Sequence, residues 1–573
     1  MTFDLRIVPF SRFGSYMAVS HLDADRIARR GTKDMAAGLY LRTLHGEARS
    51  PDVFHMELTR DGRPVAFREE ASPSVLRLVA GRGAVEMCLP QPGVLRIRGL
   101  GGVGLRLTLR PGVFVNAVPV AGGRWQVNAF INRQQYGLMP LAGELKVDAP
   151  WTVARCERVV ADWLPGDDGT FEGAIEEFES AWTPGEHGEP FDEAVRRVDA
   201  EFAAFHDAYP PVAAEYRQAA ELAAYINWMC VVEPAGHLTR PTMLMSKNWM
   251  ANVWSWDHCF NAMALAEGSP HLAWDQMMVL FDAQHPVTGA LPDAMNDRSM
   301  LWAFVKPPVH GWALRWMFSR NARLADTRRL KEVFAPLARW TEWWFTWRDS
   351  DGDGLPEYHH GNDSGWDNGT VFDAGLPVEG PDLAAYLILQ MDVLADMAAR
   401  LGRSDAADAW KRQADVLLGL LIDHSWRGDR FAVPRSGDHA EAADSHSLLP
   451  YLPLVLGRRL PEPIRRTMIE SLAAGGLLTD HGPATEAPDS PLYEPDGYWR
   501  GPIWAPTTLL IVDGLLACGE ADLARRLAKG FCDMAAEHGM AENYDALTGQ
   551  GLRDRAYTWT ASVFLILAAW LKT

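Results

Sequence analysis

The chain has 573 residues, which is too long for one ordinary domain and predicts two or three. Apolar residues make up 48% and charged residues 23%, a globular composition with ample core. The 55 basic and 74 acidic residues give a formal charge of −19. This acidic balance argues against nucleic acid or an anionic membrane as a partner, and it leaves the oligomeric state open.

Cysteine usage and the chain ends predict a cytoplasmic protein. No CxxC pair occurs, which argues against zinc, and scattered thiols fit a reducing compartment. The segment MTFDLRIVPFSRFGSY lacks the basic and apolar regions of a signal peptide. The apolar run in AYTWTASVFLILAAWLKT is shorter than a membrane span, so we expect a buried helix there.

Residues 1–171 carry the pattern of β-strands. Short runs such as VFHMEL, VLRLVA, VLRIRG and WQVNAFI alternate apolar and polar positions, and Gly, Pro and Asp separate them. Many short strands with turn signals predict an N-terminal antiparallel β-sandwich domain.

The pattern becomes helical after residue 171. EGAIEEFESAW and EPFDEAVRRVDAEFAAFHDAY place apolar residues at i, i+3, i+4 and i+7, which predicts a helical linker over 172–209. Roughly twelve helical segments follow in 210–573, one of them starting near Glu441. Paired helices in this number predict a mainly α fold, an (α/α)6-barrel catalytic domain. A solenoid is the alternative, although no repeat of fixed length is present.

A polar, glycine-rich and aromatic loop, HHGNDSGWDNGTVFD, separates two of these helices. Asp367 stands there between Trp366 and Asn368, and a carboxyl packed against an indole loses hydration, which raises its pKa as a general acid requires. The alternative is a turn whose Asp and Asn side chains accept hydrogen bonds from the backbone. Asp363 and Asp373 compete for the acid role.

Further candidate residues lie in three other segments. In GMAENYDALTGQGLRDRAYTWTAS, the carboxylate of Glu542 would activate water, or it would belong to an ordinary loop. In ANVWSWDHCFNAMAL, Asp257 follows Trp254 and Trp256 at a helix start, where it would bind sugar hydroxyls or cap the helix. In YEPDGYWRGPIWAPTTLL, Arg500 would bind a hydroxyl or carboxylate, or form a buried ion pair.

The chain is also rich in tryptophan, with 23 residues. Large helical cores use tryptophan, but aromatic rings beside polar groups also suit a sugar, whose apolar face stacks on rings while its hydroxyls need polar partners. Such neighbours occur in Trp256-Asp257, Trp366-Asp367-Asn368 and Tyr498-Trp499-Arg500.

Together WSWD, SGWDN, YWRGPIW and ENYDALTGQG resemble glycoside hydrolase family 63 and its bacterial relatives, which include mannosylglycerate and glucosylglycerate hydrolases. The resemblance covers about residues 240–573. It implies that Asp367 is the general acid, that Glu542 is the general base and that Asp257 holds hydroxyls of the sugar in the −1 site. One departure is Gly369-Thr370, where members often carry Ser-Pro after Asp-Asn.

The same resemblance extends the substrate-binding set. The Trp and Arg of YWRG line the family's sugar pocket, and PPVHGW resembles another segment of it. The expected substrate-binding residues are therefore Trp254, Trp256, Asp257, His310, Trp366, Asn368, Tyr498, Trp499 and Arg500.

These roles predict an inverting hydrolase of a small α-linked glycoside or oligosaccharide, with no required cofactor. Asp367 would protonate the leaving oxygen while Glu542 deprotonates a water that attacks from the opposite face, with the carboxyls roughly 6.5–9.5 Å apart. One alternative is a glycoside phosphorylase on the same barrel, which would not need Glu542 as a base. The other is a non-catalytic carbohydrate-binding protein.

The segment DSDGDG resembles the opening of a calcium loop. Asp349, Asp351 and Asp353 would supply oxygen ligands, and glycine allows the sharp turn. The expected terminal glutamate is replaced by His360, so Glu357 would take its place. The sequence thus predicts either a structural calcium site or a metal-free turn.

Overall fold

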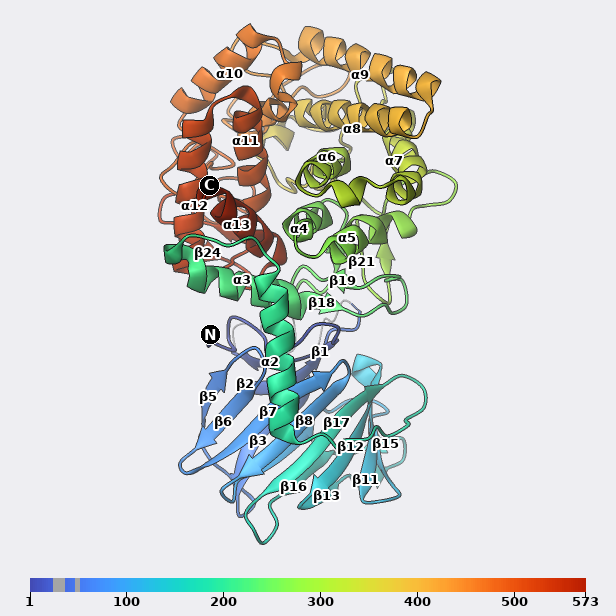
Figure 1. Cartoon of the computed structure of the whole chain (residues 1–573), viewed down its shortest axis with the longest axis vertical. Helices are drawn as coiled ribbons and strands as arrows, with labels where there is room; N and C mark the ends of the chain where they lie inside the picture. The colour runs from blue at the N-terminus through green and yellow to red at the C-terminus, as the bar shows by residue number, and fades with distance from the viewer. Residues whose placement is uncertain (24–36, 47–51) are drawn as a thin grey trace. The chain divides into compact units, whose positions relative to one another are not determined.

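A computed structural model describes residues 1–23, 37–46 and 52–573 (Figure 1). The described chain forms two compact units. The first, the β unit, comprises Met1–Asp207, Tyr225–Glu233 and Ser246–Ala251. The second, the helical unit, comprises Ala208–Ala224, Pro234–Met245 and Asn252–Thr573.

Two antiparallel sheets make up the β unit. The first has the order β1-β2-β3-β9-β16-β13, with β4 beside β3. Its strands are β1 Met17–Leu22, β2 Gly38–Thr43, β3 Asp52–Arg60, β4 Arg63–Pro64, β9 Gly104–Leu109, β13 Glu144–Asp148 and β16 Val160–Leu164. The second has the order β10-β11-β12-β17-β8-β7-β6-β5. Its strands are β5 Arg68–Ala71, β6 Leu76–Ala80, β7 Gly83–Gln91, β8 Val94–Leu100, β10 Asn116–Val120, β11 Arg124–Ala129, β12 Gln134–Ala142 and β17 Phe171–Phe178.

One apolar core joins the two sheets. Leu58 and Leu107 come from the first sheet, Leu78 and Ile97 come from the second, and all four belong to one buried cluster. Because both sheets contribute side chains to the same core, they enclose it as the sheets of a sandwich do. The antiparallel sheets predicted for the N-terminal part are therefore present. A small hairpin of β14 Trp151–Thr152 and β15 Arg155–Cys156 adjoins them.

The helical pattern expected from residue 172 is wrong for its first part. The segment 172–178 belongs to strand β17, which pairs with β12 on one side and β8 on the other. Over a few positions its apolar residues matched the helical period, but pairing on both edges satisfies its backbone as a strand. The helix of the expected linker is α2 Phe191–Asp207, which packs against β7 and buries Phe191, Ala194, Val198 and Phe202.

Helices dominate the described chain after residue 216. Eleven α-helices are present there, together with the 3-10 helix η6, Leu449–Arg459. The α-helices are α3 Arg217–Cys230, α4 Asp257–Leu265, α5 Pro270–Asp282, α6 His310–Arg320, α7 Thr327–Trp347, α8 Pro381–Arg400, α9 Ser404–Ser425, α10 Glu462–Ala474, α11 Ala505–Cys518, α12 Ala521–His538 and α13 Thr558–Leu571. Between them lie short strands, β18 Val231–Val232, β19 Thr242–Met243, β20 Val253–Trp254, β21 Ala294–Met295, β22 Met300–Leu301, β23 Asn543–Tyr544 and β24 Gly551–Leu552. Short 3-10 helices are η1 Phe130–Asn132, η2 Ala214–Tyr216, η3 Ala322–Ala325, η4 Gly361–Ser364 and η5 Thr370–Ala374.

Six helices of the helical unit close into a ring. α4 packs against α6, α6 against α8, α8 against η6, η6 against α11, α11 against α13, and α13 returns to α4 (Figure 1). The ring helices α11 and α13 are buried over most of their length. The outer helix α12 instead buries one stripe that contains Ala524, Leu527, Ala528 and Phe531. Full burial inside and amphipathic faces outside are what two concentric layers of helices require.

The segment predicted to be a helix from Glu441 starts later and is a 3-10 helix. Pro450 and Pro453 remove backbone donors that an α-helix would use, which favours the tighter turn of η6. Gly457 has φ 53° and sits so close to Ala517 that an added Cβ would lie 2.6 Å from the Ala517 Cβ. Glycine is therefore required where η6 bends against α11.

The apolar run near residue 565 forms α13, and it is buried as predicted. Within the described residues, we find no helix with the length and apolarity needed to cross a membrane. The six cysteines are all free thiols.

Candidate active site

The segment of residues 359–374, here called the SGWDN loop, is folded tightly by its own side chains. The Ser364 hydroxyl donates to the Gly361 carbonyl at 2.6 Å and accepts from the Trp366 N–H at 3.1 Å. Gly365 has φ 76°, and an added Cβ would lie 2.5 Å from the Trp256 ring. The Ser-Gly-Trp sequence is therefore needed to turn the chain beside Trp256 and present the next residue, Asp367.

The structure separates the three aspartates of this loop. Asp363 is 1% exposed and accepts hydrogen bonds from the backbone N–H groups of Val305 and His359 at 3.1 and 3.0 Å. Asp373 forms an ion pair with Arg500. The Asp367 side chain remains 33% exposed, and its only ion pair among the described residues is with a lysine. Asp373 is also exposed, but Arg500 binds both of its oxygens, so Asp367 is the one of the three whose carboxyl is neither buried nor held at both oxygens.

That lysine, Lys306, was not recognised in the sequence. Its Nζ lies 3.6 Å from Asp367 Oδ1 and 3.2 Å from Asp293 Oδ1, and it donates to the Asn362 carbonyl at 2.9 Å. Burial raises the pKa of Asp367, and the positive charge of Lys306 opposes that rise. A lone lysine in the apolar segment AFVKPPVHGW was the available signal, because a buried ammonium requires carboxylate partners.

Glu542 stands at the start of the segment of residues 539–557, here called the ENYD turn. β23 and β24 pair as a hairpin whose turn is formed by residues 546–548, and the Glu542 N–H donates to the Asp554 carbonyl at 2.7 Å. Tyr544 exchanges backbone hydrogen bonds with Ile503, which fixes the hairpin to the segment before α11. Glu542 is only 6% exposed.

The pKa of Glu542 is raised to about 7, chiefly by burial and then by the neighbouring Asp554 carboxylate. Arg553 and a hydrogen bond with Tyr498 act in the opposite direction. A carboxyl with a pKa near neutrality suits a group that must take up a proton during the reaction.

Asp257 is the first residue of α4, and the alternative role of helix cap is not what the structure shows. The cap position is Trp256, which makes no side-chain capping bond. Asp257 is 3% exposed, and its Oδ2 has no hydrogen-bond partner among the described residues. Burial raises its pKa to about 8, Lys306 opposes this, and the charges of Asp293 and Asp367 add to it. A buried carboxyl oxygen without a partner is suited to receive a ligand hydroxyl.

The phenol of Tyr498 has a pKa that depends on all three carboxyls, Asp257, Asp367 and Glu542. Burial raises the pKa of Tyr498, and the negative charges of Glu542, Asp367 and Asp257 raise it further. The charges of Glu542 and Asp257 likewise raise the pKa of Tyr557. Because such effects decay steeply with distance, the three carboxyls belong to one locality although they come from distant parts of the sequence.

Five tryptophans hold this locality together. Trp499 stacks on Trp504 with ring centroids 4.0 Å apart and on Trp366 at 5.1 Å. Trp256 lies 6.0 Å from Trp499 and 5.6 Å from Trp559. All five rings are at most 3% exposed, so they bind the segments to one another rather than offering free faces. Trp254, on β20, is the partly exposed tryptophan of the predicted set.

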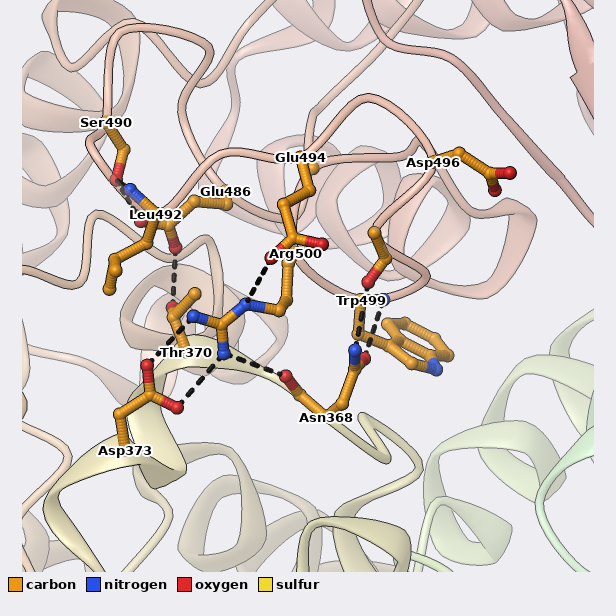
Figure 2. A network of polar contacts seen from close by, with 12 residues as sticks. Asn368, Thr370, Asp373, Glu486, Ser490, Leu492, Glu494, Asp496, Trp499 and Arg500 are labelled. Atoms are coloured by element: carbon orange, nitrogen blue, oxygen red, sulfur yellow. Dashed lines mark hydrogen bonds and ion pairs between the residues drawn. The ribbon is translucent and has the colours of Figure 1, made fainter.

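Asn368 and Arg500 link the SGWDN loop to the segment that carries Tyr498 (Figure 2). Arg500 donates to both Asp373 oxygens at 3.0 and 2.9 Å. The Asn368 side chain donates to the Gly497 carbonyl and accepts from the Trp499 N–H, both at 3.0 Å. These side chains are already engaged with protein groups, and their contacts fix the position of Asp367.

The departure at Gly369-Thr370 has a structural explanation. Thr370 is fully buried, and its hydroxyl donates to Glu486 at 2.6 Å (Figure 2). Glu486 also accepts from the His446 N–H at 2.7 Å and from the Ser490 hydroxyl at 2.5 Å. Proline at position 370 would have no hydroxyl for this network, so the threonine anchors the end of the loop.

His310 occupies a different environment. It begins α6, is 1% exposed, and its ring packs near Phe281 and Trp340 at 5.2 and 6.5 Å. Burial lowers its pKa to about 3, so the ring is neutral. Its ring contacts are with aromatic side chains, and its role in substrate binding stays a prediction.

The aspartates of the DSDGDG loop converge. Oxygens of Asp349, Asp351 and Asp353 lie within 4.8 Å of one another. Asp349 also accepts from the N–H groups of Gly352 and Gly354 at 2.9 and 3.2 Å. Glu357 lies outside this group, since its Oε1 bonds Ser350 and, at 2.9 Å, His359. Glu379, His424 and His439 form a second convergent group.

Comparison with known proteins decides the family. A model of the mannosylglycerate hydrolase MGH1-like glycoside hydrolase domain matches residues 250–560, more than half of the chain. The chain belongs to this family. The glycoside hydrolase is 24% identical over 443 residues to a mannosylglycerate hydrolase from Rubrobacter radiotolerans, covering 58% of this chain and 98% of the relative.

Solved structures agree on the fold. A family 63 mannosylglycerate hydrolase from Thermus thermophilus, in complex with glucose, has a TM-score of 0.53 at 20% identity. It covers 60% of this chain and 98% of its own. A bacterial glucoamylase complexed with acarbose has a TM-score of 0.64 at 12% identity and covers 99% of this chain and 94% of its own. The likeness to the glucoamylase therefore includes the β unit.

Proposed function

We propose that this glycoside hydrolase cleaves a small α-linked glycoside with inversion, using Asp367 as general acid and Glu542 as general base. The supporting observation is that the charges of Asp367, Glu542 and Asp257 all raise the pKa of Tyr498. This is expected of three carboxyls that lie in one site. The ring of α4, α6, α8, η6, α11 and α13 with its outer helices supports the further proposal of an (α/α)6 barrel.

Each carboxyl has one task in this mechanism. Asp367 gives its proton to the glycosidic oxygen as the bond from that oxygen to the anomeric carbon breaks. Glu542 takes a proton from water as the water oxygen bonds the anomeric carbon from the opposite face, which requires a separation of roughly 6.5–9.5 Å. Asp257 binds sugar hydroxyls.

The site electrostatics support these tasks and give a pH dependence. Burial raises the pKa of Asp367, which favours its protonated form, and the pKa of Glu542 is about 7. Glu542 acts as a base only when ionised, so protonating it abolishes the reaction. We expect one limb of the pH profile of kcat/KM to lie near pH 7 and to disappear in Glu542→Gln.

For the substrate, the proposal extends to glycosides of glycerate. The family name and the activities of its relatives support mannosylglycerate and glucosylglycerate as the first compounds to test. A panel of these two and of α-linked disaccharides should give turnover with at least one member. Absence of hydrolysis across the panel would favour a binding protein, and release of sugar phosphate in phosphate buffer would favour a phosphorylase.

The decisive test combines variants with stereochemistry. Asp367→Asn and Glu542→Gln should each lower kcat by about 10²–10⁴-fold. Glu537→Gln, an exposed carboxyl of the outer helix α12, should leave kcat within a few-fold. NMR of the first product should show the β-anomer. A first-formed α-anomer, or near-normal rates in either active-site variant, would reject the mechanism.

We also propose that the DSDGDG loop binds a structural calcium ion through Asp349, Asp351 and Asp353. Their convergent oxygens support this, because calcium prefers several carboxylate oxygens on a flexible loop. Calcium should raise the melting temperature of the EDTA-treated protein, and Asp351→Asn should abolish the rise. Asp429→Asn, an exposed aspartate outside the group, should retain it. Equal melting temperatures with and without calcium would refute the site.

A further inference from the structure

Two residues beside Glu542 hold an unusual backbone conformation. Tyr498 has φ 65° and Arg553 has φ 59°, the left-handed region that favours glycine. They come from the two segments that meet at the candidate active site, one before α11 and one between β24 and α13. Non-glycine residues persist in this region only where their surroundings enforce it, and they concentrate at functional sites.

The side chains of these residues are stacked. The Arg553 guanidinium carbon lies 4.9 Å from the centroid of the Tyr498 ring. Arg553 Nη2 is held by Asp496, 2.8 Å from Oδ1 and 3.0 Å from the backbone carbonyl that it donates to. This geometry is a cation–π contact anchored at its outer end by a carboxylate.

A second aromatic residue fixes the Tyr498 ring. Trp504 meets that ring edge-on with centroids 4.9 Å apart, and its Nε1–H donates to the Tyr498 carbonyl at 2.9 Å. Trp504 and Arg553 therefore both contact the ring and hold it in place. Tyr498 hydrogen-bonds Glu542 and thereby lowers the pKa of that carboxyl.

The ionisable groups that face Glu542 come from two segments. Asp554, Arg553 and Tyr557 belong to the stretch between β24 and α13, and Tyr498 belongs to the segment before α11. Asp554 favours the protonated carboxyl, whereas Arg553 and Tyr498 favour the carboxylate. Arg553 is the one cation that acts on Glu542 among these groups. A cation above a phenol ring also makes its hydroxyl a stronger donor.

We propose that Arg553 is a positioning residue for Glu542, acting through Tyr498, whose phenol it holds against the carboxylate. The inference rests on the proposed role of Glu542 as general base. Arg553 touches neither the water nor the sugar in this arrangement. It keeps Glu542 ionised and oriented for accepting a proton.

The pH profile of kcat/KM tests this proposal. Arg553→Met keeps the bulk of the side chain but removes its charge, so the limb set by Glu542 should move to higher pH by about half to one unit. Arg553→Lys keeps the charge and should move the limb less. Tyr498→Phe should also move it upward, because the carboxylate loses a hydrogen bond.

A double variant tests whether the effect passes through Tyr498. Arg553→Met in the Tyr498→Phe background should move the limb by less than it does in the wild type. Shifts that simply add would show that Arg553 acts independently of Tyr498 and would overturn the proposal.

Arg553→Gly separates this role from a purely structural one. Glycine suits φ 59°, so this variant should fold and melt at or above the wild-type temperature. Its limb should nevertheless move as in Arg553→Met. An unmoved limb in both folded variants, with Glu542→Gln inactive, would refute the role of Arg553 alone. Near-normal activity of Glu542→Gln would overturn both this proposal and the proposed function.

Discussion

Asp367 in the SGWDN loop and Glu542 in the ENYD turn have different surroundings. Asp367 is one-third exposed and lies directly beside the ammonium of Lys306. Glu542 is 6% exposed, has a carboxylate neighbour in Asp554, and is countered by Arg553 and the phenol of Tyr498. Burial raises the pKa of both groups. The comparison teaches that burial raises the pKa of both carboxyls, while exposure and neighbouring charges differ in the way the two proposed roles require.

The largest expected effect concerns the proton that Asp367 is proposed to give to the leaving group. A substrate whose leaving group needs no protonation, such as a glycosyl fluoride, should bypass Asp367 but still require Glu542. We expect Asp367→Asn to recover most of its lost kcat/KM on the fluoride, a recovery of about 10²-fold or more, because the acid step supplies that much. Glu542→Gln should show no comparable recovery. The measurement is the ratio of kcat/KM for fluoride and natural glycoside in each variant.

Recovery in Glu542→Gln but not in Asp367→Asn would exchange the two roles. Equal recovery in both would remove the distinction between acid and base. The catalytically silent control is Glu537→Gln, which should show the wild-type ratio.

Lys306 offers an intermediate effect on one side of the comparison. Its positive charge favours the ionised form of Asp367, so Lys306→Met should raise the pKa of that carboxyl. A higher pKa keeps the acid protonated to higher pH, and the limb set by Asp367 should move upward by about one unit. Lys306→Arg should keep the limb close to its wild-type position. An unchanged limb in Lys306→Met would show that the ammonium does not govern Asp367.

The smallest effect concerns the contacts in Figure 2. Arg500→Lys loses the two-point contact with Asp373 and should lower kcat/KM by a few-fold, because the SGWDN loop is held less firmly. Arg106→Lys in the β unit loses an equivalent contact with Asp162 and should leave kcat/KM unchanged. Each change should cost about 1 kcal/mol or less in the free energy of unfolding, since the pairs are partly exposed. Equal kinetics of the two variants would remove any positioning role from Arg500.

Much of the fold was accessible from periodicity. The antiparallel sheets and the number of helices followed from alternating and helical patterns, because each buried face must be apolar. Two local failures have physical causes. The strand β17 is short enough to match either period, and the prolines of η6 produce a 3-10 helix that apolar spacing does not distinguish from an α-helix.

The site was accessible only in part. Motifs brought out Asp257, Asp367 and Glu542, but no pattern in the sequence states which side chains are already engaged. Asn368 and Arg500 are predicted to bind substrate, and the structure adds that their side chains contact protein groups. Lys306 and Arg553 went unnoticed because their importance arises from neighbours distant in sequence. Such contacts depend on tertiary packing, which cannot be read from a single sequence.

The contact of α13 with α4 closes the ring of helices, so the ring can form only after α13 has been synthesised. During synthesis, α4, which begins with Asp257, is made some three hundred residues before its partner α13. Until that partner docks, apolar faces of the earlier helices stay exposed and the ring of helices is not closed. We therefore expect a chain that stops before α13 to lack hydrolytic activity, even if its other helices form.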